Sequence, residues 1–284
     1  MLVSKNVTMF PRSEVVVQHH SHDPRSRILD IPNGYNIRDL GGIPLANGGK
    51  ISNRRIVRGE APVLLGKEGV TELVKYGVRH VIDLRSDGER ASEGHGALQK
   101  FIDSGVITLH PVQLAPNAPW GIDPKKDNHY ADMAGNYMKC LNDGGSALVP
   151  ALAKALADIG DTPYAIYIHC AAGKDRTGIV TAAILLAMGA DRTAILDDYV
   201  LTGELYHPVI LKLGTREIYK SDLKYPNWQI LSPKRDVLET AFARIDAQGG
   251  IEHWLLTHGV SDATLKDWQA RLTVAPRQRL RIAS

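Results

Sequence analysis

The segment around Cys170 contains the residue types needed to bind a phosphate group and to attack it. It reads "IYIHCAAGKDRTGIV" over 166–180, so that an apolar, β-branched run ends at His169 and an apolar, helix-like run begins at Gly178. A strand–turn–helix unit with glycines can curl its backbone N–H groups inward into an anion-binding nest. The positive end of the following helix points at the same place, and Arg176 adds a planar fork of donors that matches two phosphate oxygens. The segment therefore predicts a site for a tetrahedral oxyanion.

Cys170 lies where the donors that would hold a phosphate also stabilise a thiolate. A thiolate facing phosphorus is placed for in-line attack, and the same donors stabilise the charge that spreads over the equatorial oxygens. The sequence has no GxxxxGK[ST] pattern, so the loop is not a nucleotide P-loop. A buried structural thiol is the alternative, but the position of Cys170 before a Gly-Arg loop favours nucleophilic phosphoryl transfer through a phosphocysteine.

The spacing Cys170-x5-Arg176-Thr177, preceded by His169, resembles the signature of the protein tyrosine phosphatase superfamily. The longer match "HCAAGKDRTG" is similar to a bacterial branch with Lys and Asp inside the loop, whose members act on phosphotyrosine, phosphoserine/threonine and phosphoinositides. The resemblance covers about residues 30 to 273. Its further segments are "NIRDLGG" at 36–42, "VIDLRSDGER" at 81–90, "ILDDYVLTG" at 195–203 and "LETAFARIDAQGGIEHWLLTHGVSDATLKDWQARL" near the C-terminus.

This resemblance implies roles for the residues of the loop. Cys170 is the nucleophile and Arg176 the phosphate clamp. His169 orients the loop and stabilises the thiolate, and the Thr177 hydroxyl assists release of the thiolate during hydrolysis. The phosphate-binding positions are the residues that follow the nucleophile: Ala171, Ala172, Gly173, Lys174, Asp175 and Arg176.

Lys174 resembles the loop lysine of phosphoinositide phosphatases, in which a second phosphate needs a cation. The first loop position of those lipid enzymes is often lysine as well, whereas Ala171 stands here, and this departure argues against a purely lipid substrate. Alone, the run 174–176 would be interpreted as a solvated charge run; inside this loop it is interpreted as part of the phosphate site.

The general acid must be a carboxyl group within hydrogen-bond reach of the leaving oxygen. Many tyrosine phosphatases carry it in a Trp-Pro-Asp sequence, which this chain lacks. The candidates are Asp175 inside the loop and Asp83 at the end of a neighbouring strand, and we favour Asp175 because the bacterial branch has an aspartate there. For Asp83 in "DLR", an ion pair that supports the loop is the alternative. Arg38 and Asp39 in "NIRDLGG" are expected to be structural.

The elements that position these residues predict an α/β fold with a central, mostly parallel sheet flanked by helices, which the resemblance makes tyrosine-phosphatase-like. Ligands bind outside the carboxyl ends of such strands, where Asp83 and Cys170 lie. Strands are expected at 54–59, 78–86, 105–114 and 164–169. Helices are expected at 65–77, about 130–141, 146–159, from the loop to about 188, and 192–201, with a helical C-terminal third.

We expect a flexible N-terminal arm over 1–30 and a single phosphatase domain over 31–284, in which 115–128 is a Pro-, Asn- and Asp-rich loop. The segment 203–232 carries many aromatic and aliphatic residues after the helix that follows the loop. It is either a helical lid over the phosphate site or ordinary packing.

Composition excludes several other classes of protein. The net charge of +3 does not favour nucleic-acid binding, and no apolar run has the roughly 20 residues of a membrane helix. The two cysteines form no CxxC pair, and Cys140 is expected in the core. His19, His20 and His22 have no matching acidic or thiol residue nearby to complete a metal site, so we expect no bound metal. We expect no cofactor either. A cytoplasmic location fits best, with export lacking a classical signal peptide as the alternative.

The leading function is a cysteine-dependent phosphatase, a phosphoric monoester hydrolase of the tyrosine-phosphatase type. Its expected substrates are phosphotyrosine or dual-specificity phosphoproteins, with phosphoinositides as a further class. One alternative is a phosphatase for a small phosphorylated metabolite such as a sugar or nucleoside phosphate. Another is a phospho-binding module without turnover, against which the presence of Cys170, Arg176 and Thr177 argues.

Overall fold

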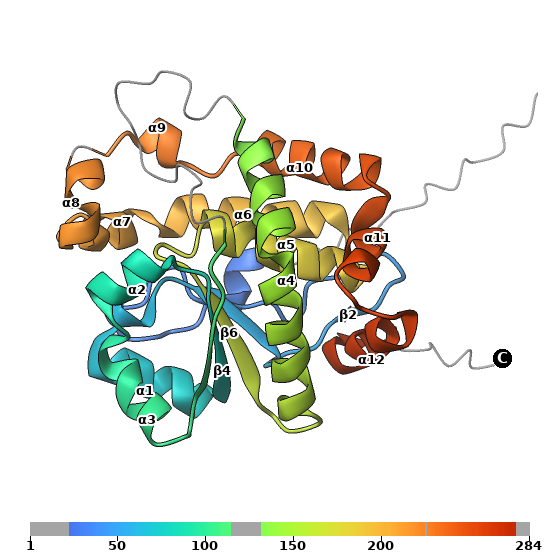
Figure 1. The fold of residues 1–284 in the computed structure, drawn as a ribbon, viewed down its shortest axis with the longest axis horizontal. Helices are drawn as coiled ribbons and strands as arrows, with labels where there is room; N and C mark the ends of the chain where they lie inside the picture. The colour runs from blue at the N-terminus through green and yellow to red at the C-terminus, as the bar shows by residue number, and fades with distance from the viewer. Residues whose placement is uncertain (1–22, 115–131, 225, 277–284) are drawn as a thin grey trace, which may run out of the picture.

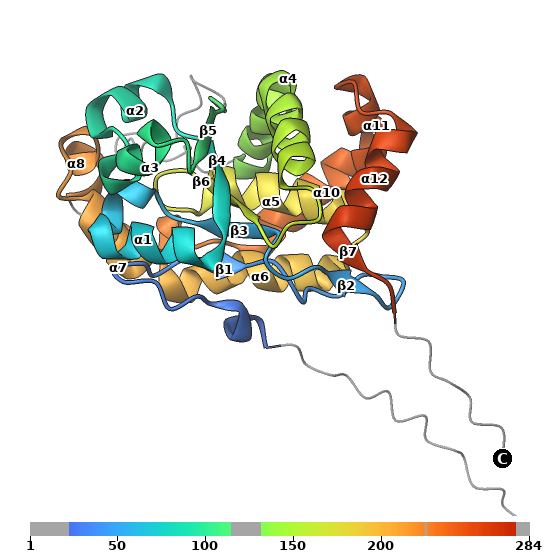
Figure 2. The same ribbon diagram turned by 90° about the horizontal axis from the view of Figure 1, so that it is seen from below.

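A mostly parallel sheet lies at the centre of the molecule (Figures 1 and 2). The computed structural model describes residues 23–114, 132–224 and 226–276. The sheet has five strands in the order β1-β3-β6-β4-β5; β1 is antiparallel to β3, and the other neighbours are parallel. This confirms the predicted α/β class with a mostly parallel sheet. The strands are β1 (Arg38–Asp39), β3 (Ile56–Gly59), β6 (Ala165–His169), β4 (Val78–Asp83) and β5 (Thr108–Pro111).

Alternation along the central strand β6 divides the apolar core between the two faces of the sheet. Ile166 and Ile168 belong to the larger core, whereas Ala165 and Tyr167 belong to the smaller one. The whole strand is buried, as expected for a parallel strand covered on both faces. Burial on both faces explains why this segment is a continuous apolar run in the sequence.

Helices cover both faces. On the side of the larger core are α4 (Met133–Ile159), α5 (Asp175–Ala187), α6 (Arg192–Leu205), α10 (Arg235–Ala247), α11 (Gly250–Thr257) and α12 (Asp262–Leu272). On the other face are α1 (Gly66–Tyr76), the 3-10 helix η3 (Gly96–Leu98) and α3 (Gln99–Asp103). The remaining elements are η1 (Pro24–Arg27), the 3-10 helix η2 (Pro62–Leu64), α2 (Asp87–Glu93), α7 (His207–Leu213), α8 (Glu217–Leu223), α9 (Trp228–Leu231) and a small antiparallel pair, β2 (Lys50–Ile51) with β7 (Thr273–Val274).

The prediction of two helices between about residues 130 and 159 is wrong, because α4 continues without a break through Gly144 and Gly145. Both glycines are contact points. A Cβ atom on Gly144 would lie 2.1 Å from Leu114 Cδ2, and one on Gly145 would lie 2.3 Å from His258 Nε2. Each glycine in a helix interior lowers helix stability by about 1 kcal/mol. Here the close packing of Leu114 on Gly144 and of His258 on Gly145 stabilises the continuous helix.

The prediction of a flexible arm through residue 30 is wrong for residues 23–30, while 1–22 lie outside the described residues. Asp23 caps η1, and the Arg27 guanidinium donates to Asp198 Oδ1 at 2.7 Å. Ile28 forms a bridge with Arg38 of β1. These contacts attach the segment to the body of the protein. The predicted loop at 115–128 also lies outside the described residues.

Within the described ranges, no helix combines the length and the apolar character needed to cross a membrane.

Candidate active site

The predicted loop residues meet at the carboxyl end of β6, in the middle of the sheet. His169 ends β6, α5 begins at Asp175, and the connecting loop holds Cys170 at 3% exposure. Asp83 ends the adjacent strand β4, where it is the register partner of His169. The structure therefore brings the loop and the end of β4 to one edge of the sheet, as the sequence predicted.

The backbone of the loop is turned so that its carbonyl groups face outward. The carbonyl oxygen of Cys170 accepts a hydrogen bond from His169 Nδ1 at 2.9 Å, and that of Ala171 accepts one from Ala61 N at 2.9 Å. The next two carbonyls, of Ala172 and Gly173, accept from Asn36 Nδ2 at 3.0 and 3.3 Å. In a planar trans peptide the N–H group points opposite to the C=O group. Four consecutive outward carbonyls thus direct the N–H groups of residues 171–174 inward, which is the geometry of an anion-binding nest.

Gly173 is required at the tightest point of the loop. Its φ is +70°, and a Cβ atom there would lie 2.4 Å from both the carbonyl carbon and the oxygen of Gly59. A side chain would therefore meet both a steric clash with the backbone of β3 and an unfavourable φ.

Arg176 is oriented by Glu89, a residue that the sequence analysis did not identify. Its Nη1 and Nη2 donate to Glu89 Oε2 and Oε1 at 2.5 and 2.8 Å, and Nη1 also donates to the Leu84 carbonyl at 3.2 Å. Burial alone would raise the pKa of Glu89, but the bonds with Arg176 lower it to about 2. The carboxylate is therefore charged at neutral pH and holds the guanidinium in one plane. The sequence signal is a capping box, in which Ser86 and Glu89 start α2, but it does not reveal the contact with Arg176.

A second carboxylate, Asp198 of α6, joins three arginines beneath the loop. It pairs with Arg27, Arg38 and Arg58 at 2.7, 3.0 and 2.8 Å. Burial alone would raise the pKa of Asp198, but these arginines hold it well below its usual range. Arg58 also donates to the Gly173 carbonyl at 3.0 Å, so the cluster is connected to the loop.

The structural roles expected for Arg38 and Asp39 agree with their contacts. Arg38 is fully buried on Asp198, and Asp39 accepts from the backbone N–H groups of Gly41 and Arg54 and from the Tyr76 hydroxyl.

Asp83 and His169 are both completely buried. The Asp83 carboxylate accepts from Arg85 Nε at 3.0 Å and from Arg85 Nη2 at 2.7 Å. Burial alone would raise the pKa of Asp83, but the positive charge that the neighbouring His169 ring gains at low pH and the ion pair with Arg85 bring it well below its usual range. Burial lowers the pKa of His169 to about 4, so this ring is neutral at pH 7. His169 therefore acts on the loop through its hydrogen bond to the Cys170 carbonyl and not through a positive charge.

Asp175 has a different environment from Asp83. Its side chain is 22% exposed, accepts a hydrogen bond from the Tyr137 hydroxyl at 2.9 Å, and lies 3.2 Å from Lys174 Nζ. It borders a small pocket lined by Met133, Tyr137, Lys174, Asp175, Tyr199, Ser232, Lys234 and Val237. Of the two candidate acids, Asp175 is the one that an entering molecule can reach. Tyr137 was missed because α4 is distant from the loop in the sequence.

The remaining predicted residues lie as follows. Thr177 is completely buried in the first turn of α5, and its hydroxyl has no hydrogen-bond partner among the described residues. Cys140 lies in the larger core, where burial raises its pKa, in agreement with the expected core position. The described residues contain no group of three or more His, Cys, Asp or Glu that could hold a metal ion.

The segment 203–232 packs directly on the loop. Ala171 and Ala172 share an apolar cluster with Val209, Ile210 and Leu213 of α7. From α8, the Tyr219 hydroxyl donates to Glu89 Oε1 at 2.8 Å. The segment thus contacts both the nest and the carboxylate that orients Arg176.

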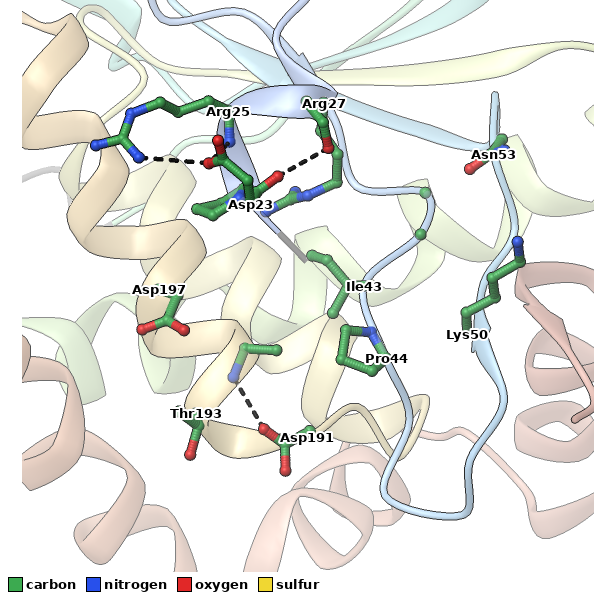
Figure 3. A pocket seen from close by; sticks show the side chains of 15 residues that line it. Asp23, Arg25, Arg27, Ile43, Pro44, Lys50, Asn53, Asp191, Thr193 and Asp197 are labelled. Carbon is green, nitrogen blue, oxygen red and sulfur yellow. Dashed lines mark hydrogen bonds and ion pairs between the residues drawn. The ribbon is translucent and has the colours of Figure 1, made fainter. Parts of the chain in front are cut away.

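A larger pocket lies away from this loop, between η1, the 41–53 segment and the start of α6 (Figure 3). Figure 3 shows Asp191, which caps α6, together with Lys50 and Asn53 across the opening. None of the predicted catalytic or phosphate-binding residues lines this pocket. The pocket is therefore separate from the candidate active site.

Comparisons with known proteins agree with this geometry. The model of the family described as "Tyrosine phosphatase family" matches residues 29–274. A putative tyrosine-protein phosphatase of Cupriavidus necator is 28% identical over 173 residues, which cover 58% of this chain and 59% of that protein. The triple specificity protein phosphatase PtpB of Mycobacterium tuberculosis is 26% identical over 200 residues, which cover 62% of this chain and 70% of that protein.

Substitution of Asp198 tests the carboxylate beneath the loop. Asp198→Asn should lower the free energy of unfolding at pH 7 by about 3–5 kcal/mol, because it leaves three arginines without their shared counter-charge. Its sequence neighbour supplies the control: Asp197 is 45% exposed and pairs with Arg235, so Asp197→Asn should change stability by no more than about 1 kcal/mol.

Urea denaturation measures both variants. The folded protein lowers the pKa of Asp198, so the charged carboxylate stabilises the fold fully above the unfolded pKa of about 3.9, and this stabilisation is lost as the pH falls below that value. The difference in the free energy of unfolding between wild type and Asp198→Asn should therefore narrow below about pH 4. Equal losses in the two variants at pH 7 would contradict this account.

Proposed function

Because the chain belongs to the tyrosine phosphatase family, we propose that it hydrolyses phosphomonoesters through a phosphocysteine at Cys170. One observation carries the proposal: Cys170 begins a loop whose first four carbonyls are all hydrogen-bonded to surrounding groups, which directs the N–H groups of residues 171–174 inward and leaves room for an anion beside Cys170. Such preorganised donors stabilise the charge of a phosphoryl group in transfer.

The reaction has two steps. The Cys170 thiolate attacks phosphorus, the bond to the leaving oxygen breaks, and Asp175 gives its proton to that oxygen. Asp175 then accepts a proton from water, the water oxygen attacks phosphorus, and the sulfur–phosphorus bond breaks to release phosphate and the thiolate. We assign release of the thiolate to the Thr177 hydroxyl, which is buried in the first turn of α5.

Asp175 is favoured over Asp83 as the acid because of exposure and pairing. Asp83 is completely buried, and its carboxylate is engaged by Arg85. Asp175 borders a pocket and receives a hydrogen bond from Tyr137. Only Asp175 therefore combines a position next to Arg176 with access for a substrate.

The proposed substrates are phosphotyrosine and other phosphoprotein side chains, with phosphoinositides as a further class. The names of the relatives support phosphoproteins as substrates, since one is named a putative tyrosine-protein phosphatase and the other a triple specificity protein phosphatase. Lys174 and Lys234 line the pocket beside Asp175, which supports a substrate with a second anionic group.

The proposed nucleophile is tested with Cys170→Ser. This variant should release p-nitrophenolate from p-nitrophenyl phosphate at least about a thousandfold more slowly than wild type, while orthovanadate or phosphate still binds. The matched control is Cys140→Ala, which removes the other thiol from the core; its folded fraction should keep the wild-type rate. Robust turnover by Cys170→Ser would refute the mechanism.

The proposed acid is tested by the dependence on the leaving group. An alkyl phosphate needs its oxygen protonated, whereas p-nitrophenolate leaves unaided, and a general acid contributes about 10²–10⁴-fold. Asp175→Asn should therefore slow a phosphoserine peptide by about a hundredfold or more and p-nitrophenyl phosphate by less than tenfold. It should also flatten the basic limb of the pH–rate profile.

Asp83→Asn is the comparison for this test. It should lower stability and affect both substrates by the same factor, because its partner is Arg85 rather than the substrate. If Asp83→Asn alone gives the leaving-group-dependent loss, the two assignments exchange.

A further inference from the structure

Helix α8 of the 203–232 segment holds α2 at two points. The Tyr219 hydroxyl donates to Glu89 Oε1 at 2.8 Å. Arg216, the residue immediately before α8, has its Nε 3.3 Å from Glu93 Oε2. Glu89 and Glu93 are four residues apart, so they share one face of α2. Figures 1 and 2 both show α8 beside α2. One of these two contacts ends on the carboxylate that orients the phosphate clamp, and the other does not.

Glu89 receives four donors, two on each oxygen. Oε1 accepts from Arg176 Nη2 and from the Tyr219 hydroxyl, and Oε2 accepts from Arg176 Nη1 and from the Ser86 backbone N–H at 2.6 Å. Ser86 fixes one oxygen from the start of α2, and Tyr219 fixes the other from a separate element. The plane of the carboxylate, and with it the plane of the Arg176 guanidinium, is therefore defined from both sides.

The Tyr219 hydroxyl remains protonated and can donate its hydrogen bond to Glu89 at all times. Burial, together with the negative charge of Glu89, raises the pKa of Tyr219. The hydroxyl thus keeps its proton over the working pH range, and its hydrogen bond to a charged acceptor is of the stronger, charge-assisted kind.

We propose that Tyr219 is a positioning residue for the phosphate clamp: through its hydrogen bond to Glu89 it aims Arg176 at the bound phosphoryl group. This rests on the proposed function, in which Arg176 binds that group. The segment 203–232 thereby contributes to phosphate binding through a residue that need not touch the substrate. Without the hydroxyl, Ser86 is the one remaining donor among the described residues, besides Arg176, that fixes the Glu89 carboxylate. The carboxylate can then turn about its bond with Ser86, and the guanidinium fork of Arg176 turns with it.

The test is Tyr219→Phe, assayed by kcat/KM for p-nitrophenyl phosphate and by the dissociation constant of orthovanadate. We expect kcat/KM to fall about tenfold and orthovanadate to bind about tenfold more weakly, as for loss of one hydrogen bond to a charged group. The matched control is Tyr76→Phe, which removes a phenol that donates to another carboxylate, Asp39 Oδ2, at 2.6 Å. It should leave orthovanadate binding unchanged.

A double-mutant cycle with Glu89→Ala, which leaves no acceptor for the phenol, separates positioning from general support of the fold. If Tyr219 acts through Glu89, then Tyr219→Phe should change orthovanadate binding less than twofold in the Glu89→Ala background. An unchanged tenfold loss in that background would overturn the proposal.

Arg216→Gln supplies a second test of the proposal if Glu89→Ala does not fold. It releases the other contact of α8 on α2 without removing a donor from Glu89, so it should weaken orthovanadate binding less than threefold. Equal losses in Arg216→Gln and Tyr219→Phe would mean that only attachment of the helix matters, and would also overturn the proposal. An unmodified protein that binds orthovanadate but has no turnover would contradict the proposed function, whereas the binding measurements would still test Tyr219.

Discussion

The site depends on one steric constraint, the contact between Gly173 and the backbone of β3. At this point the loop passes so close to Gly59 that no side chain fits, and the φ of Gly173 is in the left-handed region. Because the loop is seated there, Arg58 and Asn36 can reach its carbonyl groups. The outward direction of these carbonyls turns the N–H groups inward, so the donors of the anion site are backbone groups that the surrounding side chains hold in place.

Buried carboxylates paired with arginines stabilise this arrangement. Glu89 holds Arg176, Asp83 holds Arg85, and Asp198 joins the arginines beneath the loop. Removing one member of such a pair leaves an uncompensated buried charge, which is strongly destabilising. The pairs therefore fix side-chain directions around the loop, and the positive charge near the anion site comes from Arg176 rather than from His169.

The fold class and the chemical loop could be predicted because their signals are local. The strand–loop–helix segment around Cys170 is continuous in the sequence, and the run of buried residues in β6 is visible in it. The partners that complete the site could not be predicted, since Glu89 and Tyr219 lie 87 and 130 residues from the groups they bind. Local reasoning was wrong for α4, where Gly144 and Gly145 serve packing between elements that are distant in the chain.

The choice between Asp175 and Asp83 shows the same limit. Both aspartates stand at the ends of expected elements, and neither spacing nor composition distinguishes them. The sequence offers an ion pair as the alternative role of Asp83, and the structure shows Asp83 buried and paired with Arg85; the partial exposure of Asp175 emerges only from the three-dimensional arrangement. What the sequence leaves open is therefore the environment of each group rather than its identity.

The central claim is that a phosphoryl group passes through the sulfur of Cys170. Rapid acid quenching during turnover of p-nitrophenyl phosphate, followed by peptide mass spectrometry, measures this most directly. The account predicts one phosphoryl group on the peptide that contains Cys170, rising within the first turnover and disappearing when substrate is exhausted. Product formation without any phosphoryl group on Cys170, or with the group on another residue, would contradict it.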